Sequence, residues 1–348
     1  MNTRKAPEKK PPKKQLRSIQ HDLFSDFLAA DPSEVSNTVY LWESVPKYFF
    51  NREQIKKLRT KDGLAQPYKW KYLYGNTEFT VRIQPALIEQ EDGKSVAFFP
   101  GASEEFVEEA LKKIFSDQNF GMHDPSNNES WVRFSLRMIY KELKDKGRTR
   151  SIPQIKHAID VMSSSVITIY REGVEFWKGQ ILQDLVTVGR LDYLDKDKDS
   201  HHVARLPLFI SKSINSLDYR QFNYNRLMSC DEQLSRWIYK KLIHRYIQAN
   251  QINDYHFMYL DIEKNSGLLQ QTRANDNRRK VISALNELKE KGVIKEFETE
   301  DKREGRKIVD VKYTIKPSTD FVKEQKAANK RLSVQKEKLE NKNLKKIK

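Results

Sequence analysis

The residues with the clearest chemistry form a cluster of cations and amides at positions 273–280. Arg reads guanine through paired hydrogen bonds, Asn reads adenine, and helix N-terminal amides favour phosphate. The candidates are Arg273, Asn275, Asn277, Arg278, Arg279 and Lys280. Charge runs are usually solvated helix faces, but these cations fall in a first helical turn, where the helix dipole disfavours them unless an anion is nearby. The cluster therefore favours contacts to DNA.

The segment that must position this cluster reads as a helix followed by a hairpin. Asn275 is the expected N-cap and Gly292 the left-handed residue that ends the helix. Two β-rich runs, 293–298 and 307–315, flank a charged tip at 299–306. This is the outline of a winged helix, whose helix enters the DNA major groove while the hairpin reaches the flanking backbone. The expected phosphate contacts of the hairpin are Lys302, Arg303, Arg306 and Lys307.

The same order of elements precedes this segment at a constant offset of 126 residues. Helices are expected at 103–117 and 231–248, strands at 131–134 and 257–260, and helices at 155–162 and 281–288. Ser135 and Asp261 are expected N-caps, and a hairpin follows in each copy, the first with strands 166–170 and 174–190. Helix, strand, helix, helix and hairpin thus occur twice, which predicts two tandem winged helices.

The equivalent surface of the first copy is less basic, and a DNA contact and a dimerisation or docking role are both open for it. Its candidates are Arg148, Arg150, Gln154, Lys156 and His157. Between the copies, aromatic residues at 217–228 could stack on single-stranded bases, although core packing is favoured for Tyr219, Phe222 and Leu227. The next expected helix carries further possible phosphate contacts at Arg236, Lys240, Lys241, His244 and Arg245.

No constellation for catalysis is found in the sequence. His201 and His202 are adjacent and so lack the alternating spacing of a metal-dependent tyrosine nickase. Asp195, Asp197 and Asp199 lack the following Glu of a calcium loop. No complete phosphate-binding loop is present. We therefore expect a protein that is not an enzyme and uses no cofactor or metal.

Length and composition bound the remaining possibilities. A chain of 348 residues predicts two domains plus tails, and the single Cys230 excludes an internal disulfide. No apolar run approaches a membrane span and no signal peptide is evident, so we expect a cytoplasmic protein without membrane contact. The net charge of +16 lies mostly in the two ends: residues 1–20 hold seven Lys or Arg and one Glu, and residues 316–348 hold eleven against four acids.

These patterns predict an α+β, helix-rich fold: two tandem winged-helix domains, a β-containing N-terminal extension and basic disordered tails. The expected organisation is a basic arm at 1–20, an extension with a short helix and hairpins at 21–100, winged-helix domains at 101–217 and 218–317, and a tail at 318–348.

Two resemblances add expectations. Residues 20–24 resemble the bacterial sliding-clamp-binding motif, matching it at Gln20, Asp22, Leu23 and Phe24 and departing from it at His21. The alternative is that Leu23, Phe24, Phe27 and Leu28 form the apolar face of a helix packed on the first domain.

Over approximately residues 96–318, the chain resembles the RepA-like plasmid replication initiators of Gram-negative bacteria. The segments that carry this resemblance are 99–108, 206–209, 219–224, 234–237 and 266–269 with the Arg-rich helix that follows. The resemblance implies binding to direct repeats at a replication origin, strand opening, recruitment of host helicase and sliding clamp, and homodimers that repress their own gene. A winged-helix transcriptional repressor without a replication role is the alternative.

Overall fold

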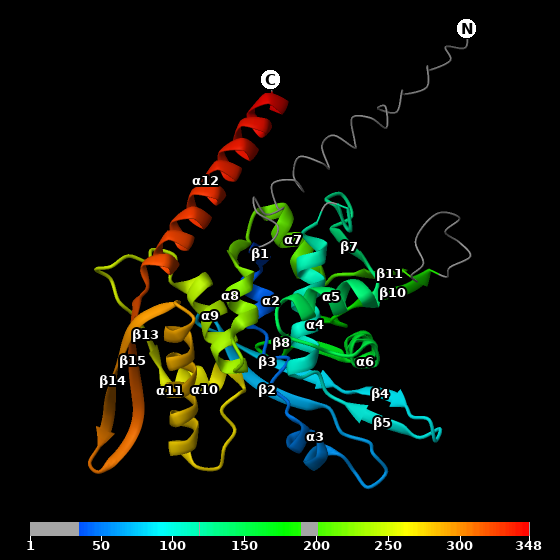
Figure 1. The fold of residues 1–348 in the computed structure, drawn as a ribbon, viewed down its shortest axis with the longest axis horizontal. Helices are drawn as coiled ribbons and strands as arrows, with labels where there is room; N and C mark the ends of the chain where they lie inside the picture. Colours follow the sequence, from blue (N-terminus) through cyan, green and yellow to red (C-terminus); the bar gives the residue numbers. More distant parts are fainter. Residues whose placement is uncertain (1–34, 118, 189–200, 348) are drawn as a thin grey trace.

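The computed structural model describes residues 35–117, 119–188 and 201–347 (Figure 1). Within them the chain is a mixed α and β protein with several small sheets. The arm at 1–20, the clamp-like motif at 20–24 and the Asp residues at 195, 197 and 199 lie outside the described residues. No helix of the described part has a stretch long and apolar enough to cross a membrane.

The N-terminal segment is β-rich, as predicted, but carries two short helices instead of one. Its elements are β1 (Val35–Thr38), α2 (Tyr40–Ser44), α3 (Arg52–Leu58), β2 (Tyr68–Tyr74), β3 (Thr77–Gln84), β4 (Ala86–Glu89) and β5 (Ser95–Phe98). Helix α3 is set by a capping box in which Asn51 and Gln54 exchange hydrogen bonds between side chain and backbone. Trp42 of α2 is fully buried and ties this segment to the core.

We call residues 102–179 module 1. Its elements are α4 (Ala102–Phe115), β6 (Gly121–Asp124), β7 (Glu129–Phe134), α5 (Leu136–Asp145), α6 (Ile152–Ser164), β8 (Val166–Arg171) and β9 (Val174–Gly179). Ser135 caps α5 as predicted, because its Oγ accepts a hydrogen bond from the Met138 amide at 3.2 Å. The hairpin β8–β9 turns at Glu172 and Gly173, both with positive φ.

The prediction of one strand over 174–190 was wrong. The chain leaves β9 at Gly179, where an added Cβ would lie 2.6 Å from the Trp177 ring. Ile181 and Leu182 then insert into the core, and β10 (Gln183–Val188) belongs to another sheet. The burial of these two side chains breaks a run that reads as continuous in the sequence.

A connecting region follows, with elements β11 (His201–Arg205), α7 (Leu208–Ser216), β12 (Arg220–Asn223) and α8 (Tyr224–Ser229). Strand β11 pairs with β10 and β7, and β12 pairs with β1. Tyr219, Phe222 and Leu227 are buried, which confirms the prediction that they pack in the core.

We call residues 233–317 module 2. Its elements are α9 (Gln233–Arg245), β13 (Tyr255–Met258), α10 (Tyr259–Ser266), α11 (Ala274–Glu290), β14 (Ile294–Glu304) and β15 (Lys307–Pro317). The order helix, strand, helix, helix and hairpin recurs here, without a counterpart to β6 of module 1. Asp261 is not the N-cap of α10, because the helix already begins at Tyr259 and Met258 occupies the capping position.

Helix α11 buries one apolar face and ends at a glycine. Val281, Ala284, Leu285 and Leu288 are fully buried at the spacing of a helix face. Gly292 takes φ +68° as predicted, and its amide donates to the Lys289 carbonyl. The N-cap is Arg273 and not Asn275, whose side chain instead accepts a hydrogen bond from Arg278 in the second turn.

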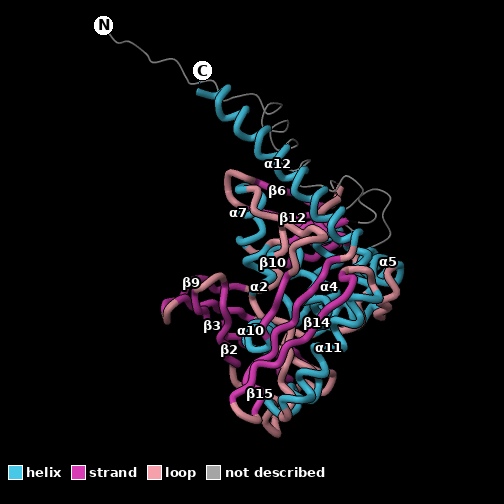
Figure 2. The backbone as a smooth tube through the Cα atoms, turned by 90° about the vertical axis from the view of Figure 1, so that its left-hand side faces the viewer, coloured by secondary structure: helices cyan, strands magenta, loops and turns pink. Residues whose placement is uncertain are grey.

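The hairpin β14–β15 is longer than predicted. Strand pairing continues to Glu304, so most of the expected tip is strand and only Gly305 and Arg306 form the turn. With β13, the hairpin makes a three-stranded sheet in the order β13-β15-β14. Its tip and the first turn of α11 lie at the same lower end of the molecule in Figure 1, and Figure 2 shows the same arrangement from the side.

The C-terminal segment is a helix and not a disordered tail. Helix α12 (Thr319–Ile347) begins against the body with Phe321 and Val322 buried, and then extends away from it, opposite the hairpin tip (Figures 1 and 2). Arg220 donates to Gln325 at 2.8 Å and to Asn329 at 2.7 Å, which anchors its first turns.

The buried apolar side chains form one continuous cluster from Val39 to Val322. Strand pairs such as β1–β12 and β3–β8 join segments on opposite sides of the predicted boundaries. The N-terminal segment and the two modules are therefore packed on a shared core.

Candidate nucleic-acid interface

The N-terminal end of α11 presents Arg273, its N-cap residue, and Arg279, in its second turn, to solvent. Arg273 is exposed, and the Arg279 side chain is 82% exposed with a loose ion pair to Asp276 at 3.7 Å. Arg278 is half-buried and donates to Asn275 at 2.6 Å, so the two side chains form one polar unit. These side chains have the chemistry to bond bases and phosphates.

Asn277 does not belong to this exposed set. Its side chain is buried; its Oδ1 accepts from the Gln271 amide at 2.9 Å and its Nδ2 donates to the Gln271 carbonyl at 3.1 Å. Both bonding groups of the amide are therefore used to hold the loop before α11. The prediction that Asn277 contacts a base is therefore wrong. Its side chain positions the N-terminal end of α11.

Lys280 also points back into the protein. Its Nζ donates to the Leu268 carbonyl at 3.0 Å, and burial lowers the pKa of this ammonium. The sequence pattern did not separate Lys280 and Asn277 from their exposed neighbours, because adjacent helical positions point to different sides.

The tip of the β14–β15 hairpin carries the predicted cations on its surface. Lys302, Arg303, Arg306 and Lys307 are all exposed. Arg303 pairs with Asp301 at 2.7 Å, while the acids nearer the base of the hairpin pair with Lys312 and Lys316. Among the described residues, Lys302, Arg306 and Lys307 make no ion pair and are available for phosphate.

In module 1, Arg148 faces the end of α8 and the segment between α8 and α9 instead of solvent. Its Nε donates to the Met228 carbonyl at 2.6 Å and its guanidinium pairs with Asp231. The ring of Phe106 lies under the guanidinium at 5.2 Å. Of the two roles left open for this surface, Arg148 serves the docking one.

The other candidates of module 1 lie around the start of α6. Arg150, Gln154 and His157 line a cleft of about 980 Å³ between this helix and α3, and Lys156 is exposed beside it. Three cations of α3 and its C-terminal end, absent from the sequence-based candidates, complete the cleft: Arg52, Lys56 and Arg59. Their spacing of four and three residues places them on one helix face, a signal that the sequence does contain.

The cations predicted on α9 are mostly not available to DNA. Arg236, Lys240 and His244 are buried, Lys241 is half-buried, and only Arg245 is exposed. Burial lowers the pKa of His244 to about 3, and its Nε2 lies 3.2 Å from the Thr38 hydroxyl. Most of the charged residues along α9 therefore form contacts inside the protein and are not available to DNA.

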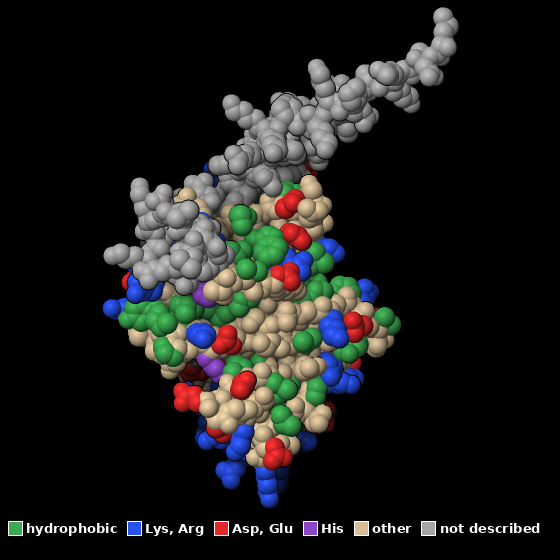
Figure 3. Space-filling view, turned by 90° about the vertical axis from the view of Figure 1, so that its right-hand side faces the viewer, with side chains coloured by type: hydrophobic (Ala, Val, Ile, Leu, Met, Phe, Trp, Pro, Cys, Tyr) green, Lys and Arg blue, Asp and Glu red, His purple; other side chains and the backbone are tan. Residues whose placement is uncertain are grey.

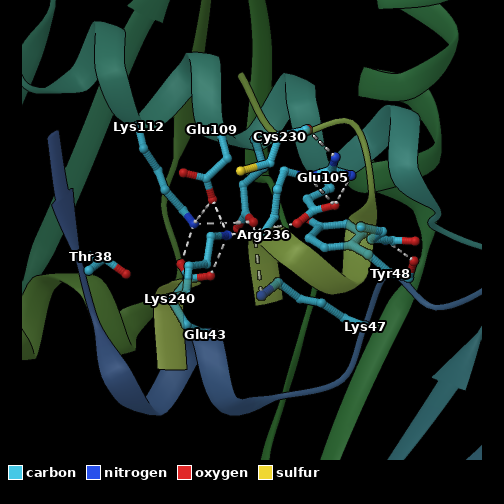
Figure 4. A network of polar contacts seen from close by, with 12 residues as sticks. Thr38, Glu43, Lys47, Tyr48, Glu105, Glu109, Lys112, Cys230, Arg236 and Lys240 are labelled. Atoms are coloured by element: carbon cyan, nitrogen blue, oxygen red, sulfur yellow. Dashed lines mark hydrogen bonds and ion pairs between the residues drawn. The ribbon is translucent and has the colours of Figure 1, made fainter. Parts of the chain in front are cut away.

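These contacts belong to a network of buried charges from α2, α4 and α9 (Figure 4). Arg236 binds Glu105 at 2.8 Å, and Lys240 binds Glu109 at 2.6 Å and Glu43 at 2.9 Å. Lys112 contacts Glu109 at 3.0 Å, Glu108 at 3.3 Å and also Glu43. We call this set, with Lys47 near Glu108, the charge joint.

The charges of the joint balance, with four carboxylates against four cations. Burial disfavours the Glu43 carboxylate, but Lys112, Lys240 and Lys47 outweigh it and hold the pKa of Glu43 well below its usual range. Burial likewise opposes the charge of Lys112, while Glu108, Glu109 and Glu43 raise its pKa well above normal. The joint therefore keeps all three elements in one arrangement.

Cations are concentrated at the end of the molecule that holds α3, the first turn of α11 and the hairpin tip. In Figure 3, Lys and Arg side chains project at the lower end of the face shown, with Asp and Glu side chains between them. Within the described residues, no three His, Cys, Asp or Glu side chains group as a metal site. The arrangement has the chemistry to bind a polyanion.

Comparison with protein-family models gave no match, and no curated protein matched the chain. Among solved structures, the chain is similar to domains 2 and 3 of RctB, with a TM-score of 0.47, 13% identity, and coverage of 83% of this chain and 99% of that one. A second structure of RctB domains 2–3 gives a TM-score of 0.44 at 12% identity, covering 78% and 97%. The Pi initiator protein in complex with iteron DNA gives 0.38 at 14% identity, covering 63% and 91%.

Proposed function

We propose that this chain is a sequence-specific DNA-binding initiator of plasmid replication, built on two winged-helix modules in tandem. The observation that carries the proposal is the lower end of module 2. There Arg273 and Arg279 are exposed and Arg278 is half-buried at the N-terminal end of α11, beside a projecting hairpin whose tip holds unpaired cations. A helix of this kind enters the major groove while the hairpin lies along the flanking backbone.

Arg278 and Arg279 are the residues proposed to read bases. Arg278 is ordered by its bond to Asn275, and Arg279 pairs only loosely within its own turn. Each can exchange these weak contacts for two hydrogen bonds to guanine. Lys302, Arg306 and Lys307 are proposed to bind phosphate, which adds affinity and fixes the register without reading sequence.

The charge joint supports the use of both modules on one DNA site. Because buried ion pairs connect α4 of module 1 to α9 of module 2, the two modules are proposed to meet the DNA at a fixed separation. A fixed separation suits short repeats of constant length. The basic ends of the chain add salt-sensitive affinity for any DNA.

The finer parts of the proposal come from the resemblance to initiators. They are opening of the origin strands, recruitment of a host helicase and of the sliding clamp, and formation of homodimers that repress the chain's own gene. All are roles of a binding protein without a catalytic step.

Footprinting on the DNA that flanks the chain's own gene tests the proposal. We expect protection at regular intervals over direct repeats, together with loss of a reporter plasmid's replication when the gene is deleted. A single protected palindrome with replication intact would contradict the initiator role and indicate a repressor. A covalent tyrosyl–DNA adduct or primer synthesis would contradict the absence of catalysis.

A further inference from the structure

The cleft at the start of α6 has an unusual charge balance. Its volume is about 980 Å³, and its walls are α3, the end of β5, and the first turns of α4 and α6. The lining carries four Arg or Lys side chains and His157, against Glu104 as its one acid. Glu104 is buried and its carboxylate accepts a hydrogen bond from the Gly101 amide at 2.8 Å, so one acid stands against four cations in the lining.

Two arginines of the lining are held in place. Arg59 donates from Nε to the Ala97 carbonyl at 2.7 Å, and its guanidinium lies over the Phe98 ring at 4.5 Å. Arg150 donates to the Thr149 carbonyl at 2.9 Å and lies 5.5 Å from the Phe106 ring. Neither forms an ion pair within the described part of the chain, and burial lowers the pKa of both. They are ordered cations that make no ion pair, although Glu104 acts on Arg150 from a longer distance.

Arg52 and Lys56 on the α3 wall are different, because both are exposed and without an acidic partner in the same described part. With the two ordered arginines they surround the cleft with four positive charges. Such a set matches a ligand with several phosphates in a row, since each phosphate can pair with one cation.

The shape of the cleft indicates which polyphosphate fits. A duplex is read by an element that protrudes into its groove, as the first turn of α11 does. The first turn of α6 instead forms one wall of a concave space, and α3 forms another. A flexible single strand can follow a concave cationic groove, and the stacked Arg59 and Phe98 offer a surface for a base.

We propose that this cleft binds a single-stranded nucleic-acid segment through its phosphates, while α11 and the β14–β15 hairpin hold duplex DNA. The proposal rests on the proposed function, because strand opening next to a bound duplex would supply the single strand. Module 1, which is the less basic of the two, would then bind the single strand while module 2 binds the duplex.

The test compares two neighbouring lysines of α3. Lys56 lines the cleft, whereas Lys57 is equally exposed and lies outside its lining. The probe is a labelled oligo-dT strand of about 12 nucleotides, within the range of single-strand site sizes. Its affinity for the full chain is measured by fluorescence anisotropy over a series of salt concentrations.

We expect Lys56→Gln to weaken oligo-dT binding roughly threefold to fivefold and to reduce the salt slope by about 0.7, the value for removing one phosphate-binding cation from a single strand. Arg52→Gln with Lys56→Gln should double the change in slope. Lys57→Gln should bind oligo-dT as tightly as the unchanged chain does, because Lys57 lies outside the lining of the cleft. The basic ends of the chain are the same in every variant and so contribute equally to the affinity of each.

Duplex binding separates this proposal from the proposed function. Lys56→Gln should keep the duplex footprint, and Arg278→Ala with Arg279→Ala should lose the footprint while keeping oligo-dT affinity. Equal losses for Lys56→Gln and Lys57→Gln, or a footprint lost together with oligo-dT binding in Lys56→Gln, would overturn the cleft. The unchanged chain could also give no duplex footprint while Lys56→Gln still binds oligo-dT more weakly than Lys57→Gln does. That result would contradict the proposed function and would support the cleft as a single-strand site.

Discussion

Apart from β6, modules 1 and 2 have the same order of elements but use their strands differently. In module 2, β13 pairs with β15, so the strand and the hairpin form one small sheet. In module 1, the equivalent strand β7 pairs with β6 and β11, and the hairpin pairs through β8 with β3 of the N-terminal segment. Module 2 closes its sheet by itself, and its hairpin tip remains free to project. Module 1 uses its hairpin to hold the rest of the chain.

The first turns of α6 and α11 differ in the same way. The offset of 126 residues places Ile152 and Pro153 opposite Arg278 and Arg279. Helix α6 has a capping box between Ser151 and Gln154, whereas α11 has no side-chain cap bond at its N-cap. Module 1 thus satisfies its own helix start, while module 2 leaves cations and unbonded amides there for an anion.

The largest effect is expected from separating the two modules at the charge joint. Glu105→Gln leaves the buried Arg236 without its carboxylate, which should lower the free energy of unfolding by about 3–5 kcal/mol. Urea unfolding measures the loss. The exposed Glu53→Gln is the control and should stay within about 0.5 kcal/mol. Equal stability of the two variants would mean that Arg236 and Glu105 do not hold the modules together.

The next effect tests whether α11 is the reading helix. Arg278→Ala with Arg279→Ala should weaken binding to the footprinted DNA by about 1–3 kcal/mol for each base-reading side chain. Lys289→Ala, an exposed change at the other end of the same helix, should have little effect. An equal loss on random DNA would show that the arginines hold phosphate only.

A smaller effect concerns the buried His244, which contacts Thr38 where module 2 meets the N-terminal segment. Burial lowers its pKa to about 3, so between about pH 6.5 and 5 the unfolded chain binds a proton here that the folded chain does not. Stability should therefore fall as the pH decreases, by up to about 1.4 kcal/mol per pH unit from this group. Urea unfolding at several pH values should show a shallower fall in His244→Gln. The exposed His256→Gln should keep the original slope.

The smallest effect is expected at the hairpin tip. Arg306→Ala with Lys307→Ala should reduce the salt slope of duplex binding by about 0.9 for each phosphate that the tip no longer binds, without changing which sequence is preferred. Affinity titrations at several salt concentrations measure the slope. A change in sequence preference would show that the tip reads bases, and module 2 would then have two reading elements.

Periodicity and cap residues located most elements, although the caps predicted at Asn275 and Asp261 and the single strand predicted over 174–190 were wrong. The apolar positions of α11, the Ser135 cap of α5 and the glycine that ends α11 act within one or two helical turns, so local sequence carries them. The repeated order of elements follows from the same local signals. The prediction placed Arg278 and Arg279 in a first turn, where cations conflict with the helix dipole. Because α11 begins at Ala274, these arginines lie in its second turn, and its first turn carries Asp276.

Contacts between distant segments were decided only by the tertiary structure. Arg236 and Lys240 were predicted as possible phosphate contacts, but they bind carboxylates that lie more than 100 positions earlier in the chain. Asn277 was predicted to contact a base, but the backbone of Gln271 bonds both the oxygen and the nitrogen of its side-chain amide. The cations of α3 and Arg150, which precedes α6, become one cleft only when the two segments lie side by side. Local sequence determines which cations a helix carries, whereas packing determines which of them remain free to meet a ligand.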